Sequence, residues 1–478
     1  MRLQSASTAQ VAAVVVGVLI VVGAGAVVVL HGGGNSQQAV TAGRQSPAGN
    51  ASTTTPTSTS GGGNESGSSG PATLDACGAI RSSGTYVVGA DLSDGSNGRC
   101  LSILANDVVV RGGGHSITGG GSGAAVHATG VRNVTVEDLS IDGWSRGVAL
   151  ENVTDGTVAG VSVGGATAGL TVDGGGGGVV VRDSTVRSPG QVGIRVRNAD
   201  RVGVSNDTVL GSGGVGIHVL DSTNVETIGN LVNDSASHGV LYGLSAGVDT
   251  LDQSNVTNWA TPPKQAAAAN GSAARRTVAA YAPATRNGAV RNNTVRFSGD
   301  HGVFVVAARN VTVAGNDLAR NNDGIHLSHA AGVTVSGNAV THNRDDGVQL
   351  SFAANDVVAA NHVASNGDDG IYVVGNDDRI RNNTVTANGD DGIDVQASTS
   401  DHVVGNAVTL NRDDGVLLRN VTRATAHRTV ARGNGGFGID VHRSRHLALT
   451  DNEICRNAGG DVSMREARLT DRITNNAC

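Results

Sequence analysis

Aromatic residues, proline, methionine and lysine are all scarce in this sequence. Its 478 residues include 4 Phe, 2 Trp and 4 Tyr, together with 7 Pro and 2 Met. A chain of this length would ordinarily form several domains with aromatic-rich cores, and so few rings do not suit such cores. The scarcity of proline and the lack of a Gly-X-Y period also exclude collagen-like and proline-rich disordered chains. No basic tract stands out, so we expect no nucleic-acid partner.

Glycine and small aliphatic residues are what the sequence has in abundance. It contains 71 Gly, and its net charge of -7 comes from 34 basic and 41 acidic residues. This composition indicates a repetitive architecture with a core of Val, Ile and Leu.

The first 72 residues differ from the rest. Residues 11–30 carry no charge and are long enough to cross a bilayer as a helix, so residues 1–31 are predicted to be a membrane anchor or a cleaved signal. Residues 32–72 are rich in Gly, Ser and Thr and predict a flexible stalk. Either alternative places the remaining chain outside the cytoplasm, anchored to the membrane or secreted.

A short motif repeats along the remaining chain. Gly is followed by Ile or Val, any residue, and an aliphatic residue, as in Gly324-Ile325-His326-Leu327. In the second half, this glycine recurs every 22 or 23 residues at Gly302, Gly324, Gly347, Gly370, Gly392, Gly415 and Gly438. A period of this length is typical of solenoids.

Each repeat contains three short segments with the period of a β-strand. Asn338-Ala339-Val340 and Val333-Thr334-Val335 accompany the glycine motif, and turn residues separate the three. We therefore predict an all-β fold over residues 73–478, a single-stranded right-handed parallel β-helix with three strands per coil. The repeated Asn is expected to form a hydrogen-bonded ladder at an interior turn. A leucine-rich repeat has a similar period but a different leucine pattern.

The interval from Gly239 to Gly302 is 63 residues, longer than the repeat. Two coils would use about 46 of them, so the sequence predicts an extra loop near residues 257–287. This loop is either a lengthened turn or a wall beside a binding surface.

The four cysteines lie at the two ends of the repeat region. Cys77 and Cys100 are 23 residues apart, as are Cys455 and Cys478. Four cysteines allow three connectivities, and the match to the repeat length favours pairing of near neighbours. Such bridges would fix the terminal regions 73–105 and 455–478. Four buried free thiols are the alternative.

Acidic residues precede the repeat glycines from Gly302 to Gly415, as Asp-Asp pairs before Gly347, Gly370, Gly392 and Gly415. Two carboxylates stacked about 4.8 Å apart repel by about 0.9 kcal/mol in water and by about 3–4 kcal/mol at an effective dielectric constant of 20. Stacked coils would place these aspartates in an acidic column. Its repulsion must be relieved by solvation, backbone hydrogen bonds, protonation or bridging cations, and Ca²⁺ prefers such oxygen ligands. The alternative interpretation is that each aspartate only caps a turn. The predicted Ca²⁺ ligands are Asp345, Asp368, Asp390, Asp413 and Asp414.

The variable residue of the glycine motif is expected to face outward beside this acidic column. Together they would form an elongated polar groove that binds a polysaccharide. The predicted substrate-binding residues are Phe304, Gln349, Tyr372, Arg344 and Arg412. The predicted general acid–base residues are Asp346, Asp369, Asp391, His326 and Asp394.

The repeat from Asp323 to Val340, Asp-Gly-Ile-His-Leu-Ser through Gly-Val-Thr-Val-Ser-Gly-Asn-Ala-Val, resembles that of NosD-type and carbohydrate-binding/sugar-hydrolase (CASH) β-helix proteins. The resemblance covers roughly residues 101–454. The resemblance implies the fold. Proteins with this repeat include polysaccharide lyases, epimerases, glycosidases and non-catalytic surface proteins, so it leaves the function open among these classes. The Asp-Pro-His-Asp motif of alginate epimerases is absent, as are the Gly-His-Gly and Arg-Ile-Lys motifs of polygalacturonases.

Three functions follow from this resemblance and the acidic column. The first is an exported cell-surface or periplasm-like protein that binds, or binds and processes, a polysaccharide. The second is a NosD-type metal maturation protein, although copper is not supported by the ligand content because soft Met and Cys ligands are lacking. The third is a non-catalytic envelope or adhesin rod.

Overall fold

The computed structural model describes residues 70–93, 98–175, 177–243, 285–467, 472–474 and 478. The predicted anchor or signal and nearly all of the predicted stalk lie outside this part. Within it, no helix has the length and apolar character required to span a membrane.

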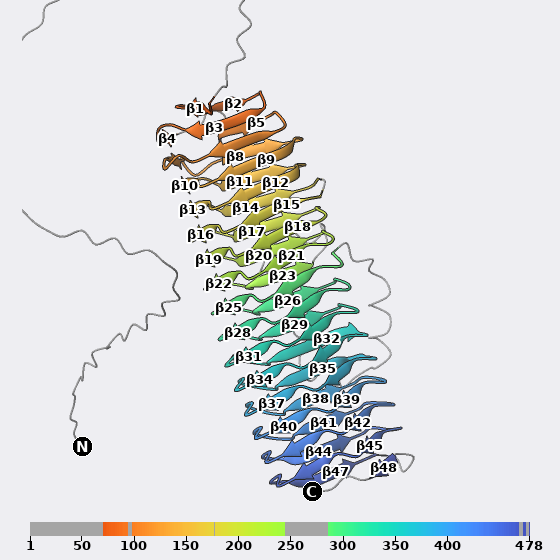
Figure 1. The fold of residues 1–478 in the computed structure, drawn as a ribbon. Coiled ribbons are helices and arrows are strands. Elements are labelled where there is room, and N and C mark those ends of the chain that lie inside the picture. Colours follow the sequence, from red (N-terminus) through yellow and green to blue (C-terminus); the bar gives the residue numbers. More distant parts are fainter. Residues whose placement is uncertain (1–69, 94–97, 176, 244–284, 468–471, 475–477) are drawn as a thin grey trace, which may run out of the picture. The chain divides into compact units, whose positions relative to one another are not determined.

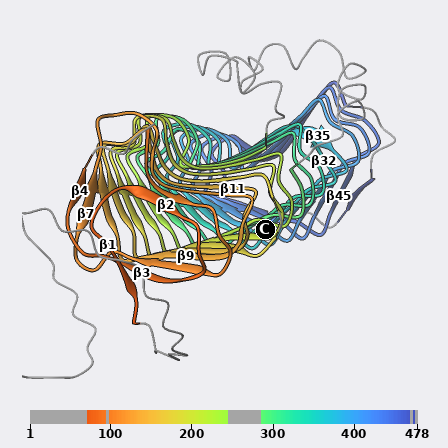
Figure 2. The ribbon, with the colours of Figure 1, turned by 90° about the horizontal axis from the view of Figure 1, so that it is seen from above.

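The described chain is a right-handed parallel β-helix with three sheets, as predicted. Sheets A, B and C contain 17, 16 and 15 strands, and each coil contributes one strand to each sheet. One coil runs from β29 (Ile325–Ser328) in sheet B through β30 (Thr334–Ser336) in sheet A to β31 (Ala339–Thr341) in sheet C. Sheet A extends from β1 (Ala72–Leu74) to β48 (Arg472–Thr474), and sheet C from β4 (Leu92–Ser93) to β46 (Glu453–Cys455). Figure 1 shows the coils stacked one below another, and Figure 2, seen from above, shows successive coils overlapping and displaced from one another.

Sheet B carries the glycine motif. Its strands are β2 (Gly78–Ile80), β5 (Arg99–Ile103), β8 (Ala124–Thr129), β11 (Arg146–Glu151), β14 (Ala168–Asp173), β17 (Val192–Arg197), β20 (Val215–Leu220), β23 (Val240–Gly243), β26 (Val303–Val306), β29, β32 (Val348–Ala354), β35 (Ile371–Asn376), β38 (Ile393–Gln396), β41 (Val416–Arg419), β44 (Phe437–His442) and β47 (Gly460–Arg465).

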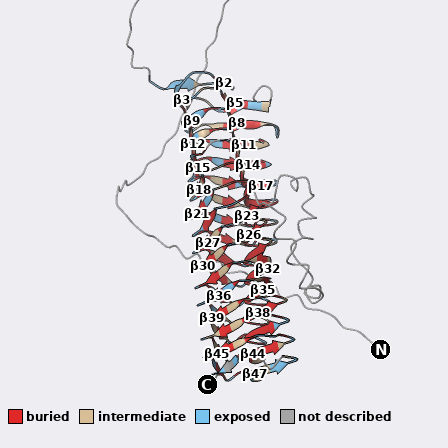
Figure 3. Ribbon diagram, turned by 90° about the vertical axis from the view of Figure 1, so that its right-hand side faces the viewer, coloured by how far each residue is buried: buried red, intermediate tan, exposed pale blue. Residues whose placement is uncertain are grey.

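Residues one repeat apart are vertical neighbours. The backbone N–H of Ile325 donates to the carbonyl of Gly347 at 3.0 Å, and that of Val348 donates to Gly370 at 3.0 Å. Aliphatic side chains therefore stack into a buried core, with Val340, Val363 and Val385 each fully buried. Buried residues follow the stacked strands, while exposed residues gather in β1 and β47 at the two ends (Figure 3).

Asparagine ladders line two interior corners. The predicted ladder follows sheet A, where Asn361 Oδ1 accepts from the backbone N–H and the Nδ2 of Asn338, each at 2.9 Å. A second ladder, which the sequence analysis missed, follows sheet C. There Asn366 Oδ1 accepts from Asn343 in the same two ways, at 3.1 and 3.0 Å. The ladders satisfy buried backbone groups where the chain turns.

The repeat glycine is required by close packing and not by its backbone conformation. A Cβ on Gly370 would lie 2.3 Å from Val385 Cγ1 and 2.6 Å from the carbonyl oxygen of Gly392. We therefore expect Gly370→Ala to lower the unfolding free energy by about 2 kcal/mol or more. Gly203→Ala is the matched control, because a Cβ there meets nothing within 4 Å. Urea unfolding of both variants tests this, and equal midpoints would contradict it.

The long interval between Gly239 and Gly302 holds one coil rather than two. In sheet B, β23 pairs directly with β26. In the other sheets, β21 (Glu226–Ile228) pairs with β24 (Ala289–Arg291), and β22 (Leu231–Asn233) with β25 (Thr294–Arg296). The additional residues therefore all lie between β23 and β24. The loop predicted at 257–287 falls almost wholly outside the described residues.

Both disulfides join near neighbours, as the spacing favours. Cys77 is bonded to Cys100, and Cys455 to Cys478. The first joins the turn before β2 to β5, the strand stacked on β2. Each bridge thus closes a loop of about one coil at an end of the solenoid.

Candidate functional site

The variable residues of the glycine motif form one continuous column on sheet B. In β29, Ile325 and Leu327 face the core, so His326 lies on the opposite face, which we call the outer face of sheet B. Pairing places His326 between Phe304 and Gln349, and Tyr372 between Gln349 and Asp394. The predicted stacking of this column is therefore present.

The predicted exposure of this column is wrong. Phe304 is 1% exposed, His326 0%, Gln349 5%, Tyr372 1% and Asp394 3%. Other side chains take the place of solvent around His326, which contacts His301 and Asp323 through one ring nitrogen and Ser351 through the other. In this structure these residues do not line an open groove.

A cluster of polar side chains surrounds His326 in this column. His326 Nδ1 lies 3.2 Å from His301 Nε2 and 3.5 Å from Asp323 Oδ2, and its Nε2 lies 3.2 Å from Ser351 Oγ. His301 Nδ1 lies 2.8 Å from the same Asp323 oxygen. His326 was predicted from the sequence, whereas its partners His301 and Asp323 were not, because both stand among the turn residues that precede the repeat glycines.

Burial controls the charge state of this cluster. Desolvation and the neighbouring His301 lower the pKa of His326 to about 4. The pKa of Asp323 is held below its ordinary value, because the opposing effect of burial is outweighed by attraction to and hydrogen bonds from His301 and His326. At neutral pH the cluster therefore contains a neutral His326 beside an ionised Asp323.

The inner aspartate of each acidic pair caps the turn. Asp346 Oδ1 accepts the backbone N–H of Asp369 at 3.0 Å, and Asp369 Oδ1 accepts that of Asp391 at 3.0 Å. Asp414, predicted as a metal ligand, belongs to this buried column, and its N–H donates to Asp391 Oδ1 at 2.8 Å. Desolvation, with repulsion from Asp394 and Asp369, raises the pKa of Asp391 to about 9. These residues hold the turn and are not solvent-exposed groups.

The outer aspartates remain accessible. Asp345, Asp368 and Asp390 are partly buried and Asp413 is exposed, with the exposed Arg344 and Arg412 immediately before two of them. Backbone bonds from Asp368 to Asp345, from Asp390 to Asp368 and from Asp413 to Asp390 measure 3.2, 3.1 and 3.1 Å, so these residues stack in register. We call Asp345, Asp368, Asp390 and Asp413 the outer acidic column. With the inner aspartates they form three groups whose carboxylate oxygens lie within 4.8 Å of one another.

Tyr372 and Asp394 lie deeper, on β35 and β38. Asp394 Oδ2 accepts a hydrogen bond from Gln396 Nε2 at 2.5 Å. Further along the same column, Asp440 is buried and forms an ion pair with Arg465. The structure thus brings Asp394 near Asp391 but gives neither a solvent-accessible carboxylate.

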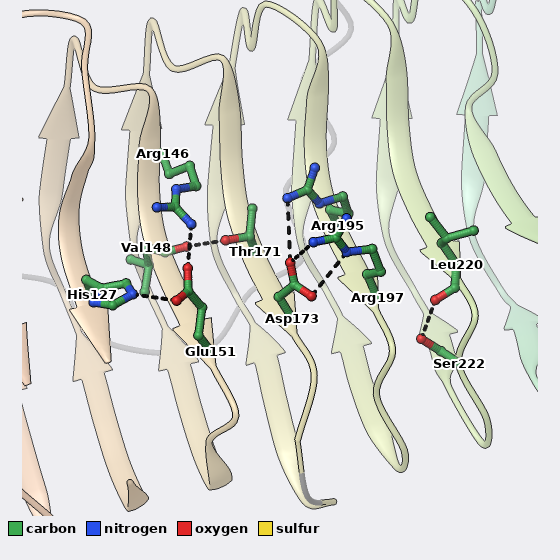
Figure 4. A network of polar contacts seen from close by, with 10 residues as sticks. All are labelled: His127, Arg146, Val148, Glu151, Thr171, Asp173, Arg195, Arg197, Leu220 and Ser222. Carbon is green, nitrogen blue, oxygen red and sulfur yellow. Dashed lines mark hydrogen bonds and ion pairs between the residues drawn. The ribbon is translucent and has the colours of Figure 1, made fainter. Parts of the chain in front are cut away.

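The first half of the outer face carries a charged network that the sequence analysis did not select (Figure 4). Glu151 lies 2.9 Å from His127 Nε2 and 2.8 Å from Arg146. Asp173 pairs with Arg197 and lies 4.0 Å from Arg195. The register of sheet B, known only once the coils are aligned, is what reveals it.

The corner between sheets B and A contains a buried aspartate ladder, which we define as Asp356, Asp378 and Asp401. Asp378 Oδ1 accepts the backbone N–H of Asp356 at 2.9 Å, and Asp401 Oδ1 accepts that of Asp378 at 2.9 Å. All three are fully buried. Desolvation raises the pKa of Asp356 to about 8 and that of Asp401 to about 6, and raises that of Asp378 well above its ordinary value.

Parallel three-sheet coils with interior asparagine ladders define a class, the right-handed parallel β-helix proteins. The chain belongs to the family described as "Right handed beta helix region", whose model matches residues 124–279 and 279–418. The model described as "Periplasmic copper-binding protein (NosD)" matches residues 363–478. No curated protein matches the chain.

Solved structures with similar coils share little sequence with this chain. A double mutant of the periplasmic alginate epimerase AlgG is 14% identical, with 75% of this chain and 79% of that chain covered and a TM-score of 0.45. The A-module of Azotobacter vinelandii mannuronan C-5 epimerase AlgE4 is 15% identical, with 82% and 91% covered and a TM-score of 0.37. The tailspike protein of E. coli bacteriophage HK620, in complex with a pentasaccharide, is 11% identical, with 77% and 74% covered and a TM-score of 0.46. At these values the likeness carries no argument about what this chain binds.

Proposed function

We propose that this protein is an extracytoplasmic β-helix that binds a polysaccharide along the outer acidic column. The observation that carries the proposal is the stacking of Asp345, Asp368, Asp390 and Asp413 in four successive coils. The strand spacing repeats one accessible carboxylate about every 4.8 Å, over about 14 Å in total. Such a periodic row of acceptors suits a polymer that presents hydroxyl donors at regular intervals, and bonds to ionised carboxylates are stronger than neutral ones.

The extracytoplasmic location is supported by the two disulfides. Stable disulfides form in oxidising compartments and are rare in the cytosol. The predicted anchor or signal in residues 1–31 would give the same location, and membrane anchoring stays a prediction.

The proposed activity is binding without bond cleavage. Asp346, Asp369, Asp391, Asp394 and His326, the residues predicted for acid–base catalysis, are all at most 5% exposed. A general acid must reach within about 3 Å of the bond that it protonates. Among the described residues, the accessible groups of the proposed site are the outer aspartates with Arg344 and Arg412, which suit recognition.

Calcium belongs to this proposal as a bridging ion. Each of the three carboxylate groups combines two outer aspartates with one inner aspartate, and such oxygen sets suit Ca²⁺. A Ca²⁺ ion bound only by the folded state would raise the apparent unfolding temperature. Thermal unfolding with Ca²⁺ and with a chelator is therefore one arm of the test.

The main test measures glycan binding by the full-length protein. A triple variant, Asp345→Asn with Asp368→Asn and Asp390→Asn, should bind the best glycan of an array at least about tenfold more weakly, because three charged acceptors are lost. The matched control changes three exposed aspartates outside the column, Asp107→Asn, Asp234→Asn and Asp377→Asn, and should bind normally. Equal affinities of the two variants, or no binding of any neutral or acidic glycan by the wild type, would contradict the proposal. The remaining interpretation would then be a non-catalytic envelope or adhesin rod.

A second candidate function is NosD-type metal maturation, which the match over residues 363–478 favours. Stoichiometric binding of copper by the full-length protein would support it. Failure of copper to bind, together with tight glycan binding, would favour the first candidate.

A further inference from the structure

Two histidines and one aspartate from adjacent coils converge at a single buried point. One imidazole nitrogen from each of His301 and His326 and one carboxylate oxygen of Asp323 lie within 4.8 Å of one another. Their side chains are 6%, 0% and 2% exposed. This cluster lies outside the residues that the NosD model matches and outside the outer acidic column.

The contacts of His326 fix which of its nitrogens faces the cluster. Its Nδ1 faces His301 and Asp323, and its Nε2 lies 3.2 Å from Ser351 Oγ, a hydroxyl that can accept a hydrogen bond. A metal-ligating histidine almost always donates through its other ring nitrogen to an oxygen acceptor. Ser351 thus orients His326 as it would orient a ligand.

His301 faces the same point from the adjacent coil. Its Nδ1 lies 2.8 Å from Asp323 Oδ2, and its Nε2 lies 3.2 Å from His326 Nδ1. The imidazole of His301 therefore offers a second nitrogen ligand beside that of His326.

The distances suit a metal ion. Ligands about 2.0–2.1 Å from a tetrahedral Zn²⁺ ion lie about 3.3 Å from one another. The separations of His326 Nδ1 from His301 Nε2 and from Asp323 Oδ2 are 3.2 and 3.5 Å.

Neighbouring rings enclose the same point. His238 stacks on His301 with ring centroids 5.1 Å apart, and Phe304 lies 4.9 Å from His301 and 5.1 Å from His326. His238 is 3% exposed, and its Nδ1 has no hydrogen-bond partner among the residues described.

We propose that His301, Asp323 and His326 bind one divalent transition-metal ion that prefers imidazole ligands, with Zn²⁺ as the representative ion. The site joins the coils of β26 and β29 through the residues that precede their glycines. It therefore adds a structural cross-link in the middle of the solenoid. Imidazole and carboxylate ligands of this kind suit Zn²⁺ and related ions.

The test uses full-length protein without an affinity tag. After chelation and dialysis, the wild type should take up one equivalent of Zn²⁺ and gain thermal stability, and Co²⁺ should give the visible absorption of a low-coordinate site. His301→Gln and Asp323→Asn should each weaken Zn²⁺ binding at least about tenfold. His362→Gln, at an exposed histidine of β34 (His362–Ala364), is the control and should bind Zn²⁺ as the wild type does.

Circular dichroism shows whether each variant folds. If one site variant does not fold, Zn²⁺ binding by the other site variant tests the proposal. If the folded wild type takes up no stoichiometric Zn²⁺, the proposal is overturned. Equal Zn²⁺ binding by wild type and by both site variants also overturns it. Glycan binding is measured separately, so failure of this site leaves the proposed polysaccharide function untouched.

Discussion

Replacing Asn361 with alanine should destabilise the protein by about 4 kcal/mol or more. Its Oδ1 accepts two bonds from Asn338, and its Nδ2 donates to the carbonyl of Val335 at 3.0 Å and to Asn383 Oδ1 at 3.0 Å. The substitution therefore removes four buried hydrogen bonds. Asn338 Nδ2 keeps its bond to the Val313 carbonyl, and Asn383 Oδ1 keeps the bond from the backbone N–H of residue 361. The backbone N–H of Asn338 and the carbonyl of Val335 lose their side-chain partner. Each such group costs about 1–3 kcal/mol, and the cavity adds to the loss.

Urea unfolding and hydrogen exchange measure this effect together. Long repeat arrays lose two-state behaviour, so a local probe is needed beside the global midpoint. The backbone N–H of Asn338 should exchange much faster in the variant, because it loses its acceptor. Asn322→Ala is the control, since that side chain is only partly buried, and it should cost less than about 1 kcal/mol. Unchanged protection of the Asn338 amide would show that the asparagine ladder does not stabilise the turn between sheets A and C.

The buried aspartate ladder should make stability fall as the pH rises. The folded-state pKa values of Asp356 and Asp401 are raised to about 8 and about 6, from ordinary values near 4. The folded state therefore binds more protons than the unfolded state between about pH 4 and pH 8. Stability is highest below this window and is lost through it, by up to about 1.4 kcal/mol per pH unit for each carboxyl.

Replacing Asp378 with asparagine should remove much of this loss. Asp378→Asn keeps the oxygen that accepts the N–H of Asp356, and its amide cannot ionise. At pH 5 the variant and the wild type should unfold at similar temperatures, whereas at pH 8 the variant should be clearly more stable. Asp234→Asn, at an exposed aspartate away from the ladder, should leave the pH profile unchanged. A wild type whose unfolding temperature does not fall between pH 5 and pH 8 would refute the interpretation.

Most of the fold could be predicted from the repeat period of the sequence. Gly324, Gly347 and Gly370 stack as predicted, because one glycine per coil is the only residue that fits against the carbonyl of the next. The ladder of Asn338 and Asn361 was predictable because this asparagine recurs at the same interval. The number of coils between Gly239 and Gly302 was not, because spacing alone does not distinguish a coil from an insertion.

The candidate site was only partly predictable. Alternation placed His326 and Tyr372 on the outer face correctly, but periodicity carries no information about what covers a face. Exposure depends on side chains from three neighbouring coils, and the contact of His326 with Ser351 joins residues 25 positions apart. The split of the acidic pairs into a buried column and an accessible one follows from the turn geometry, which the sequence does not state.

The direct stacking of β23 on β26 has a consequence for engineering and for evolution. Chain can be added between β23 and β24 while the hydrogen bonds of all three sheets continue as though nothing had been inserted. This corner is therefore a natural entry point for a reporter or a binding module. During evolution, a segment inserted between β23 and β24 could likewise change without any change in the stacked strands.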